Sequence, residues 1–355
     1  MLAPLAGGPA TPQLTAAVSN AGGLGFVATG YLKAAEAGSR LEATRQLTAR
    51  PLGVNVFASD SPPADPAVYR RYLEHFRAWA DGRGVDVGQP RYDDDDWEAK
   101  LELVAEAEVE VVSFTFGCPS PEVVARLQAS GSEVWVTITS VDEARQAEQA
   151  GADVLICQGA EAGGHRGSFV NREQLPVYSL LPLLDLVGAA SSLALVASGG
   201  IATGKALAAV LCAGARAAQI GTAFMLAPEA GTAPAHREAL KTAQETTLTR
   251  AFTGRLARGI RNDFIGEHEA YAPAAYPELH HVTSPMRKQA REQSETSRIN
   301  LWAGEAHQLA VERPAAETVR ELTESALTAL QTVLGAPWTR TARGPGDASS
   351  GRPRA

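Results

Sequence analysis

The 355-residue sequence predicts a (β/α)8 TIM barrel of the α/β class, with a small helical insertion after the last strand. Short apolar runs alternate with helical runs rich in Ala, Glu and Arg, which indicates parallel strands joined by right-handed crossovers. The strand candidates are almost continuously apolar, as is typical of strands buried on both faces. Eight such units favour a closed barrel over an open doubly wound sheet.

The predicted strands are short, and the first is truncated because the chain begins inside it. They span residues 2–5, 24–28, 52–57, 109–116, 133–139, 153–158, 193–198 and 217–221. The predicted helices span residues 12–21, 33–49, 66–80, 121–129, 141–150, 178–187 and 203–213. The glycine-rich run 21–26 leads into a strand rather than out of one, so it predicts a turn and not a dinucleotide-binding loop.

The alternating pattern ends near residue 227, so the barrel is expected to cover residues 1–227. Residues 228–311 are polar, with Pro and aromatic residues, and predict a helical insertion that covers the barrel mouth. Residues 312–338 predict a C-terminal helix that packs on the barrel. Its apolar face consists of Val319, Leu322, Ala326, Leu327 and Leu330. The tail, residues 339–355, is rich in Gly, Pro, Ser and Arg and is expected to be disordered.

Composition excludes several functional classes. The formal net charge of -8 argues against a nucleic-acid-binding surface. No apolar run is long enough for a transmembrane helix, and no signal peptide pattern is present. The three cysteines show neither disulfide nor metal-ligand spacing, which favours a reducing cytoplasm, and Cys157 and Cys212 are interpreted as core residues. The run Asp93–Asp96 is interpreted as a solvated loop rather than a cation site.

Two glycine loops follow the last two predicted strands. Ser198-Gly199-Gly200-Ile201 precedes a helix, and Gln219-Ile-Gly221-Thr222 crosses the end of the eighth strand. Backbone N–H groups in such loops can close around an anion, and a helix N-terminus adds a favourable dipole. Because barrels of this type bind phosphate at these loops, we expect a phosphorylated ligand there. The alternative is that the glycines only serve a tight strand-to-helix turn.

Amide side chains, Asn55 and Gln158, lie at the ends of two other predicted strands. Amides can pair with a ring edge that offers both donors and acceptors. Together with the phosphate site they predict a flat heteroaromatic cofactor, and FMN fits these requirements. No metal is expected.

His165 lies in the segment Gly159-Ala-Glu-Ala-Gly-Gly-His-Arg-Gly167, just after the sixth predicted strand. Functional residues of barrels lie at this end of the strands, and the neighbouring glycines let a substrate approach closely. An imidazole can give a proton to a substrate or take one from it. We therefore expect His165 to be catalytic rather than a solvent-exposed histidine without a role. Glu161 is expected to orient the loop or cap a helix.

Six stretches, taken together, resemble the nitronate monooxygenase family, formerly called 2-nitropropane dioxygenases. They are Ala3-Pro-Leu-Ala-Gly-Gly8, Val18-Ser-Asn-Ala-Gly-Gly-Leu-Gly25, Gly53-Val-Asn-Val-Phe57, Gln158-Gly-Ala-Glu-Ala-Gly-Gly-His165, Ser198-Gly-Gly-Ile201 and Gln219-Ile-Gly-Thr222. The later stretches 250–254 and 301–304 extend the resemblance into the insertion. One position departs from it, because the family often has Met where this chain has Leu5.

The resemblance implies a flavin-dependent monooxygenase that contacts FMN through residues spread over the barrel. They are Ala3, Pro4, Leu5, Asn55, Gln158, Gly163, Gly164, Gly199, Gly200, Gln219, Gly221 and Thr222. It implies that His165 is the catalytic histidine and that alkyl nitronates react with O2 to give a carbonyl compound and nitrite. Nitroalkanes and 3-nitropropionate nitronate are further candidate substrates. Tyr276 and Trp302 of the insertion are expected to line the substrate pocket, with surface or inter-helix packing as the alternative for each.

The same motifs are also compatible with other functions. NAD(P)H:quinone reductases and flavin-dependent enoyl-acyl-carrier-protein reductases share the barrel, the FMN and a histidine-bearing loop, and they differ in consuming NAD(P)H. A non-catalytic flavin-binding protein is the alternative from another class. The expected partners are a small anionic nitronate and O2, without nucleic acid or membrane, and the expected assembly is a monomer or a homodimer.

Overall fold

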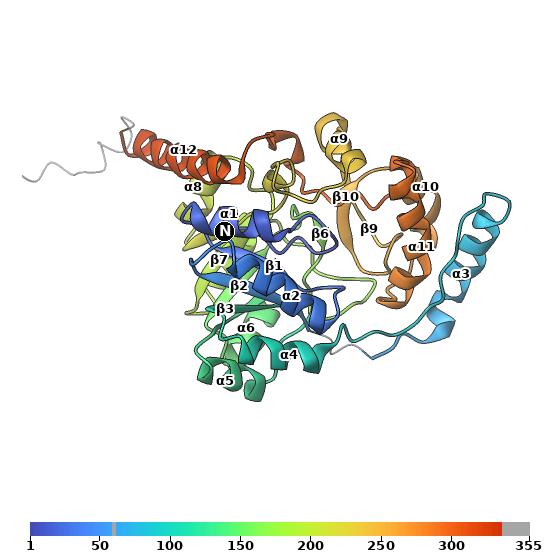
Figure 1. Ribbon diagram of the computed structural model, residues 1–355, viewed down its shortest axis with the longest axis horizontal. Coiled ribbons are helices and arrows are strands. Elements are labelled where there is room, and N and C mark those ends of the chain that lie inside the picture. Colours follow the sequence, from blue (N-terminus) through green and yellow to red (C-terminus); the bar gives the residue numbers. More distant parts are fainter. Residues whose placement is uncertain (59–61, 336–355) are drawn as a thin grey trace, which may run out of the picture.

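Seven parallel strands form the barrel wall, in the order β1-β2-β3-β4-β5-β7-β8. The computed structural model describes residues 1–58 and 62–335 (Figure 1). The strands are β1 (Gly25–Ala28), β2 (Leu52–Phe57), β3 (Val111–Thr115), β4 (Glu133–Ile138), β5 (Val154–Gln158), β7 (Ala194–Ser198) and β8 (Ala217–Gln219). All six residues of β2 are buried, as expected for a strand with packed side chains on both faces. The predicted barrel is therefore confirmed.

The first predicted strand closes the barrel, but through a single bridge. Leu2 pairs in parallel with Ile220, and its amide donates to the Leu24 carbonyl at 2.9 Å. The Ala3 amide donates to the Ile220 carbonyl at 2.8 Å. Pro4 has no N–H with which to continue the ladder. The strand predicted for residues 2–5 is thus reduced to its first residues, and residues 3–5 are part of a cavity wall instead.

Helices connect the strands, and several begin where the sequence carries a capping residue. The side chains of Thr11, Ser120, Ser140 and Thr203 each accept a hydrogen bond from a backbone N–H of the following first turn. The helices of the barrel are α1 (Pro12–Asn20), α2 (Ala34–Arg45), α4 (Trp97–Glu106), α5 (Pro121–Ala129), α6 (Val141–Gln149), α7 (Leu180–Gly188) and α8 (Gly204–Cys212). Glu161 caps α7, because both of its carboxylate oxygens lie 3.1 Å from the Leu180 amide.

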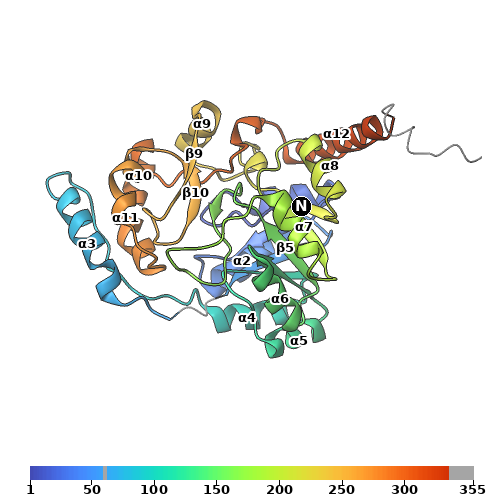
Figure 2. The ribbon, with the colours of Figure 1, turned by 180° about the vertical axis from the view of Figure 1, so that it is seen from behind.

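A second layer lies beside one end of the barrel (Figures 1 and 2). Its strands are β6 (Gly164–His165), β9 (Thr246–Thr249) and β10 (Ala257–Ile260), and its helices are α9 (Pro234–Thr242), α10 (Asp263–His268) and α11 (Glu278–Glu292). The strands form an antiparallel sheet in the order β6-β10-β9. Residues 228–311 therefore contain a β-hairpin as well as the expected helices. Since Ala257 in β10 pairs with His165 in β6, this hairpin holds the histidine loop.

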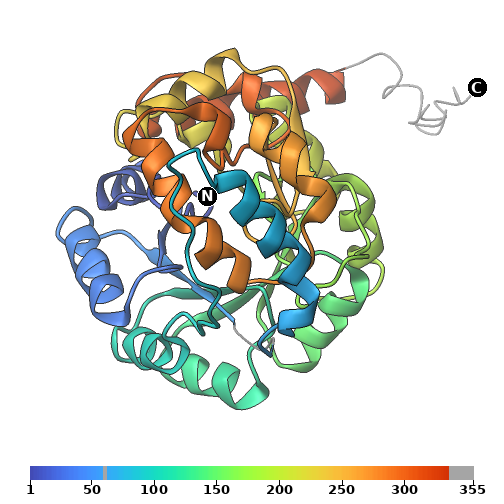
Figure 3. The same ribbon diagram turned by 90° about the vertical axis from the view of Figure 1, so that its right-hand side faces the viewer.

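Helix α3 (Pro66–Ala80) follows β2 in the chain but packs on the second layer instead of the barrel wall. Its apolar residues Tyr72 and Phe76 are fully buried in one cluster with Phe252, Phe264 and Leu279. Figure 3 shows α3 and the orange helices crossing in front of the ring of strands. The cover of the barrel mouth is consequently built from two chain segments that are far apart in the sequence.

The C-terminal helix α12 (Ala315–Gly335) packs on α8 and α1, as the sequence predicts. Leu322 and Ala326 are buried, but Leu327 is 55% exposed, so the apolar face is narrower than predicted. The tail expected to be disordered, residues 339–355, lies outside the described residues. Within residues 1–58 and 62–335, no helix has the length and hydropathy needed to cross a membrane.

The structure corrects two interpretations of short sequence features. The acidic run is not simply a solvated loop, because Asp95 lies 2.6 Å from the ammonium group of Lys100, whose side chain is fully buried. It leads into α4, which the sequence analysis missed. Burial raises the pKa of the Asp95 carboxyl to about 6, although the ion pair with Lys100 opposes this change. Cys157 is buried as expected, but Cys212 is exposed at the end of α8 rather than part of the core.

Candidate active site

A cavity of about 500 Å³ lies where the carboxyl ends of the barrel strands meet the second layer. All the predicted cofactor-binding residues are in its wall. They are Ala3, Pro4, Leu5, Asn55, Gln158, Gly163, Gly164, Gly199, Gly200, Gln219, Gly221 and Thr222. His165 and Trp302 also line it. The fold thus brings together residues that the sequence analysis took from five different strands or strand ends and from the insertion.

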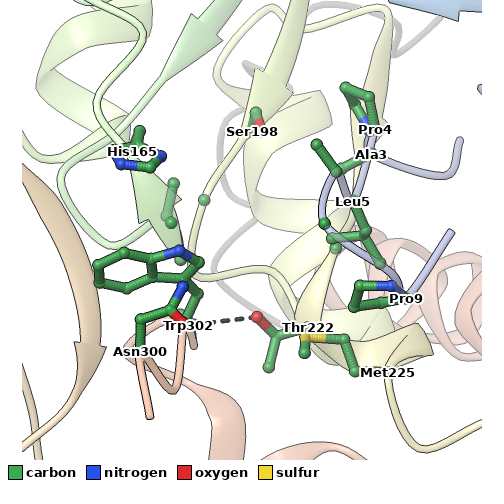
Figure 4. A pocket seen from close by; sticks show the side chains of 18 of the residues that line it. Ala3, Pro4, Leu5, Pro9, His165, Ser198, Thr222, Met225, Asn300 and Trp302 are labelled. Atoms are coloured by element: carbon green, nitrogen blue, oxygen red, sulfur yellow. Dashed lines mark hydrogen bonds between the residues drawn. The ribbon is translucent and has the colours of Figure 1, made fainter. Parts of the chain in front are cut away.

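The two glycine loops form one side of the cavity. Gly199 has φ +115° and Gly200 has φ +68°, a backbone conformation that other residues rarely adopt. The loop leads into α8, so the N-terminus of this helix adds its dipole to the cavity. Thr222 accepts a hydrogen bond from the Gly304 amide at 2.9 Å, which leaves the hydroxyl proton available to a ligand (Figure 4). These features suit a bound phosphate.

The amide side chains of Gln158, Asn55 and Gln219 differ in how many hydrogen bonds they form with other residues of the protein. The Gln158 amide donates to the His165 carbonyl at 3.1 Å and accepts from the Gly167 amide at 2.8 Å, so it holds the histidine loop. Asn55 donates to Ser113 and Thr115 on the neighbouring strand. Gln219 is 5% exposed, and its Nε2 has no partner among the described residues. A buried donor without a partner is costly, so Gln219 fits a ring or phosphate acceptor supplied by a cofactor.

His165 is held at the cavity wall by Thr253. Its Nε2 lies 2.8 Å from the Thr253 hydroxyl, and its backbone is paired with β10. Nδ1 forms no hydrogen bond with any residue that the structure describes, and it is the nitrogen available to a bound molecule. The Thr253 hydroxyl also lies 3.3 Å from both the amide and the carbonyl of Arg255, so it can donate to His165 or accept from it.

The imidazole of His165 is neutral at physiological pH. Burial is the main cause, and the nearby charges of Arg255 and Arg287 add to it, lowering the pKa of His165 to about 3. A neutral imidazole carries one N–H and one lone pair. If Thr253 donates to Nε2, Nδ1 carries the proton and can donate to an anion. If Nε2 donates to Thr253, Nδ1 can accept a proton instead.

Aromatic rings surround His165. The rings of Trp302, Tyr276 and Phe116 have centroids 5.3, 5.7 and 5.8 Å from the imidazole. Trp302 lines the cavity, whereas Tyr276 is not among the described residues that line it. Tyr276 instead packs against His165 and Phe116. Tyr31, which the sequence analysis missed, is in the wall with Phe116.

Thr253, which holds the imidazole of His165, is the main residue around the cavity that the sequence analysis overlooked. It belongs to the stretch Arg250-Ala-Phe-Thr-Gly254, which already contributed to the family resemblance, so a signal was present. His280 and Arg287 of α11 also line the cavity, but no motif in the sequence marks them. They reach the site only because α11 crosses the barrel mouth (Figure 3).

This arrangement places the protein among the (β/α)8-barrel enzymes, whose active sites lie at the carboxyl ends of the strands. The family model for nitronate monooxygenase matches residues 1–325, and the chain belongs to that family of oxidoreductases. A probable nitronate monooxygenase from Staphylococcus aureus (strain Newman) is 35% identical over 318 residues, covering 87% of this chain and 88% of its own. The resemblance inferred from the sequence motifs is thereby confirmed.

Two solved structures are similar over nearly the whole chain. Nitroalkane oxidase from Streptomyces ansochromogenes superposes with a TM-score of 0.91 at 44% identity, covering 94% of this chain and 96% of its own. FabK from Thermotoga maritima superposes with a TM-score of 0.73 at 25% identity, covering 94% of each chain. The barrel and its cover are therefore found both in a nitroalkane oxidase and in FabK.

Proposed function

We propose that the protein is an FMN-dependent enzyme that oxidises alkyl nitronates with O2 to a carbonyl compound and nitrite. The observation that carries the proposal is the imidazole of His165, held by Thr253 and lining the same cavity as the two glycine loops. FMN, when bound, supplies the redox chemistry and the reaction with O2. The residues of this chain bind, orient and exchange protons.

The glycine loops and the amide side chains would bind different parts of the cofactor. We propose that Gly199, Gly200 and Thr222 hold the phosphate through backbone N–H groups and one hydroxyl. Gln219 offers its buried, unpartnered Nε2 to an acceptor on the cofactor. Asn55 keeps its amide oxygen for the ring, while residues 3–5 pack against it as an apolar surface.

His165 acts on the substrate. With a proton on Nδ1 it donates a hydrogen bond to the nitronate, and with a lone pair on Nδ1 it accepts the α-proton of a neutral nitroalkane. Both kinds of substrate, and 3-nitropropionate nitronate, are therefore candidates. The aromatic rings around the imidazole keep water away and strengthen these interactions.

The test is to mix the purified protein anaerobically with an alkyl nitronate or with NADH and to follow the flavin absorbance. Nitronate should change the flavin spectrum without any pyridine nucleotide, and nitrite should appear when air is admitted. His165→Ala should retain FMN but lose about 10²- to 10⁴-fold in rate, the usual contribution of a positioned acid or base.

Other outcomes identify the rival functions. Rapid bleaching by NADH, without a response to nitronate, would assign an NAD(P)H-dependent flavin reductase, the nearest alternative that the sequence motifs allow. Bound FMN without turnover of any donor would indicate a flavin-binding protein without catalytic activity. A protein that takes up no FMN would refute the cofactor assignment.

A further inference from the structure

Arg287 of α11 places a buried cation in the wall of the cavity. Its side chain is 4% exposed, yet the residue lines the cavity together with His165. Nε donates to the Thr283 hydroxyl at 3.1 Å, and Nη2 donates to the His280 carbonyl at 2.8 Å. These two bonds fix the guanidinium group at one edge. Nη1 forms no hydrogen bond with the residues that the structure describes.

The positive charge of Arg287 has no carboxylate to balance it. Within residues 1–58 and 62–335 no Asp or Glu lies within ion-pair distance of its guanidinium group, and none lines the cavity. A buried charge is normally paired, because removing an unpaired ion from water is costly. Arg166 and Arg255, two further buried arginines near His165, lie outside the cavity wall. Arg166 donates to the Gln158 carbonyl, and Arg255 stacks on Phe116. Arg291 also lines the cavity, but it is exposed and donates to the Asn300 side chain. Arg287 is therefore the buried cation that a ligand in the cavity can reach.

A nitronate is an anion, and a neutral imidazole does not balance its charge. Carboxylate-like groups with two oxygens match the planar fork of a guanidinium group. We infer that Arg287 is the anion-binding residue of the substrate site and holds the negatively charged O–N–O group of the nitronate. This inference rests on the proposed function for its substrate, and it separates charge recognition by Arg287 from proton exchange by His165.

The experiment uses the FMN-loaded protein and two small probes that differ in charge but not in shape, acetate and acetamide. Saturation-transfer NMR of their methyl groups reports binding without any turnover. The variants are Arg287→Gln, which removes the charge, and Arg287→Lys, which keeps it. The matched control is Lys288→Gln, the same loss of charge at the neighbouring position, where the side chain is 76% exposed. Thermal unfolding and FMN content establish that each variant is folded.

Acetate should bind more weakly to Arg287→Gln while acetamide binding stays the same, and Lys288→Gln should resemble the wild type. In the same variants kcat/KM for a nitronate should fall about 10- to 100-fold in Arg287→Gln, the range for losing a hydrogen bond to a charged group. Arg287→Lys should retain part of the acetate binding because it retains the charge.

Equal acetate binding by wild type and folded Arg287→Gln would overturn the inference, as would a parallel loss for acetate and acetamide, which indicates a structural role. The two proposals can fail separately. Acetate binding that depends on Arg287, in a protein that oxidises no nitronate, would support the anion site and reject the proposed function. Nitronate oxidation by a protein whose acetate binding does not depend on Arg287 would support the proposed function and reject the anion site.

Discussion

Replacing Thr253 by valine tests whether His165 depends on its hydrogen-bond partner. Valine has nearly the same shape as threonine but lacks the hydroxyl that lies 2.8 Å from Nε2. The imidazole then loses the hydrogen bond that fixes its orientation. Thr253 does not line the cavity, so FMN content should stay at the wild-type level.

The size of the effect follows from the bond that is lost. Leaving a buried polar group without its partner costs about 1–3 kcal/mol, and each 1.4 kcal/mol corresponds to about tenfold. We therefore expect kcat/KM to fall by about tenfold in Thr253→Val. Thr253→Ser retains the hydroxyl and should stay within about threefold of the wild type, on the same energy scale.

Steady-state kinetics with a nitronate and with the parent nitroalkane would also identify the tautomer. A larger loss for the nitronate indicates that Nδ1 normally carries the proton, and a larger loss for the nitroalkane indicates that it normally accepts one. Wild-type activity in Thr253→Val would refute the reasoning. So would a serine variant as impaired as the valine variant, since the hydroxyl would then be irrelevant.

Three further predictions concern the loop, the imidazole and a second histidine. Gly199→Ala should lose FMN, measured by flavin absorbance, because the residue has φ +115° and a Cβ there would lie 2.9 Å from the Ala162 amide nitrogen. The control is Gly214→Ala, which has φ +94° but open space around the new Cβ, and it should keep FMN. The pKa of His165, lowered to about 3, keeps the imidazole neutral from pH 8 to pH 5, so kcat/KM should show no ionisation near pH 6.5 beyond that of the substrate. Burial also lowers the pKa of His268 to about 3, so the unfolded chain takes up a proton below pH 6.5 that the folded protein does not. Between pH 7 and pH 5, the free energy of unfolding measured with denaturant should fall by about 2 kcal/mol more in the wild type than in His268→Phe. The same pH dependence in both proteins would contradict this.

The sequence predicted best those parts of the site in which a residue's own chemistry determines its position. Gly199 and Gly200 adopt a backbone conformation that favours glycine, and Thr203 caps the next helix. His165 could be placed at the cavity because it follows a buried strand of a parallel barrel. Such features are local, or follow from a rule that applies to the whole barrel, so one sequence suffices to find them.

Features that depend on distant partners could not be predicted. Gln158 faces the cavity as expected, but its amide is used by the turn at residues 165–167, and only the fold shows this. The amphipathic pattern of α3 indicates that one face is buried without indicating against what. The burial of Asp95 depends on Lys100, whose own burial no local pattern reveals. In the sequence, Arg287 resembles any charged residue of a helix. Only the position of α11 over the barrel shows that it lines the cavity.

The position of α3 also bears on how the chain reaches its folded state. Residues 66–80 are synthesised early, but their apolar face is covered by residues 252–279, nearly two hundred positions later. Until then Tyr72 and Phe76 lack the residues that bury them and are exposed to association with other chains. A fragment cut at residue 227 would keep every barrel strand and still present this uncovered face. The barrel therefore cannot be separated from its cover by a single cut in the chain. We expect truncated forms that end near residue 227 to aggregate on expression unless α3 is removed as well.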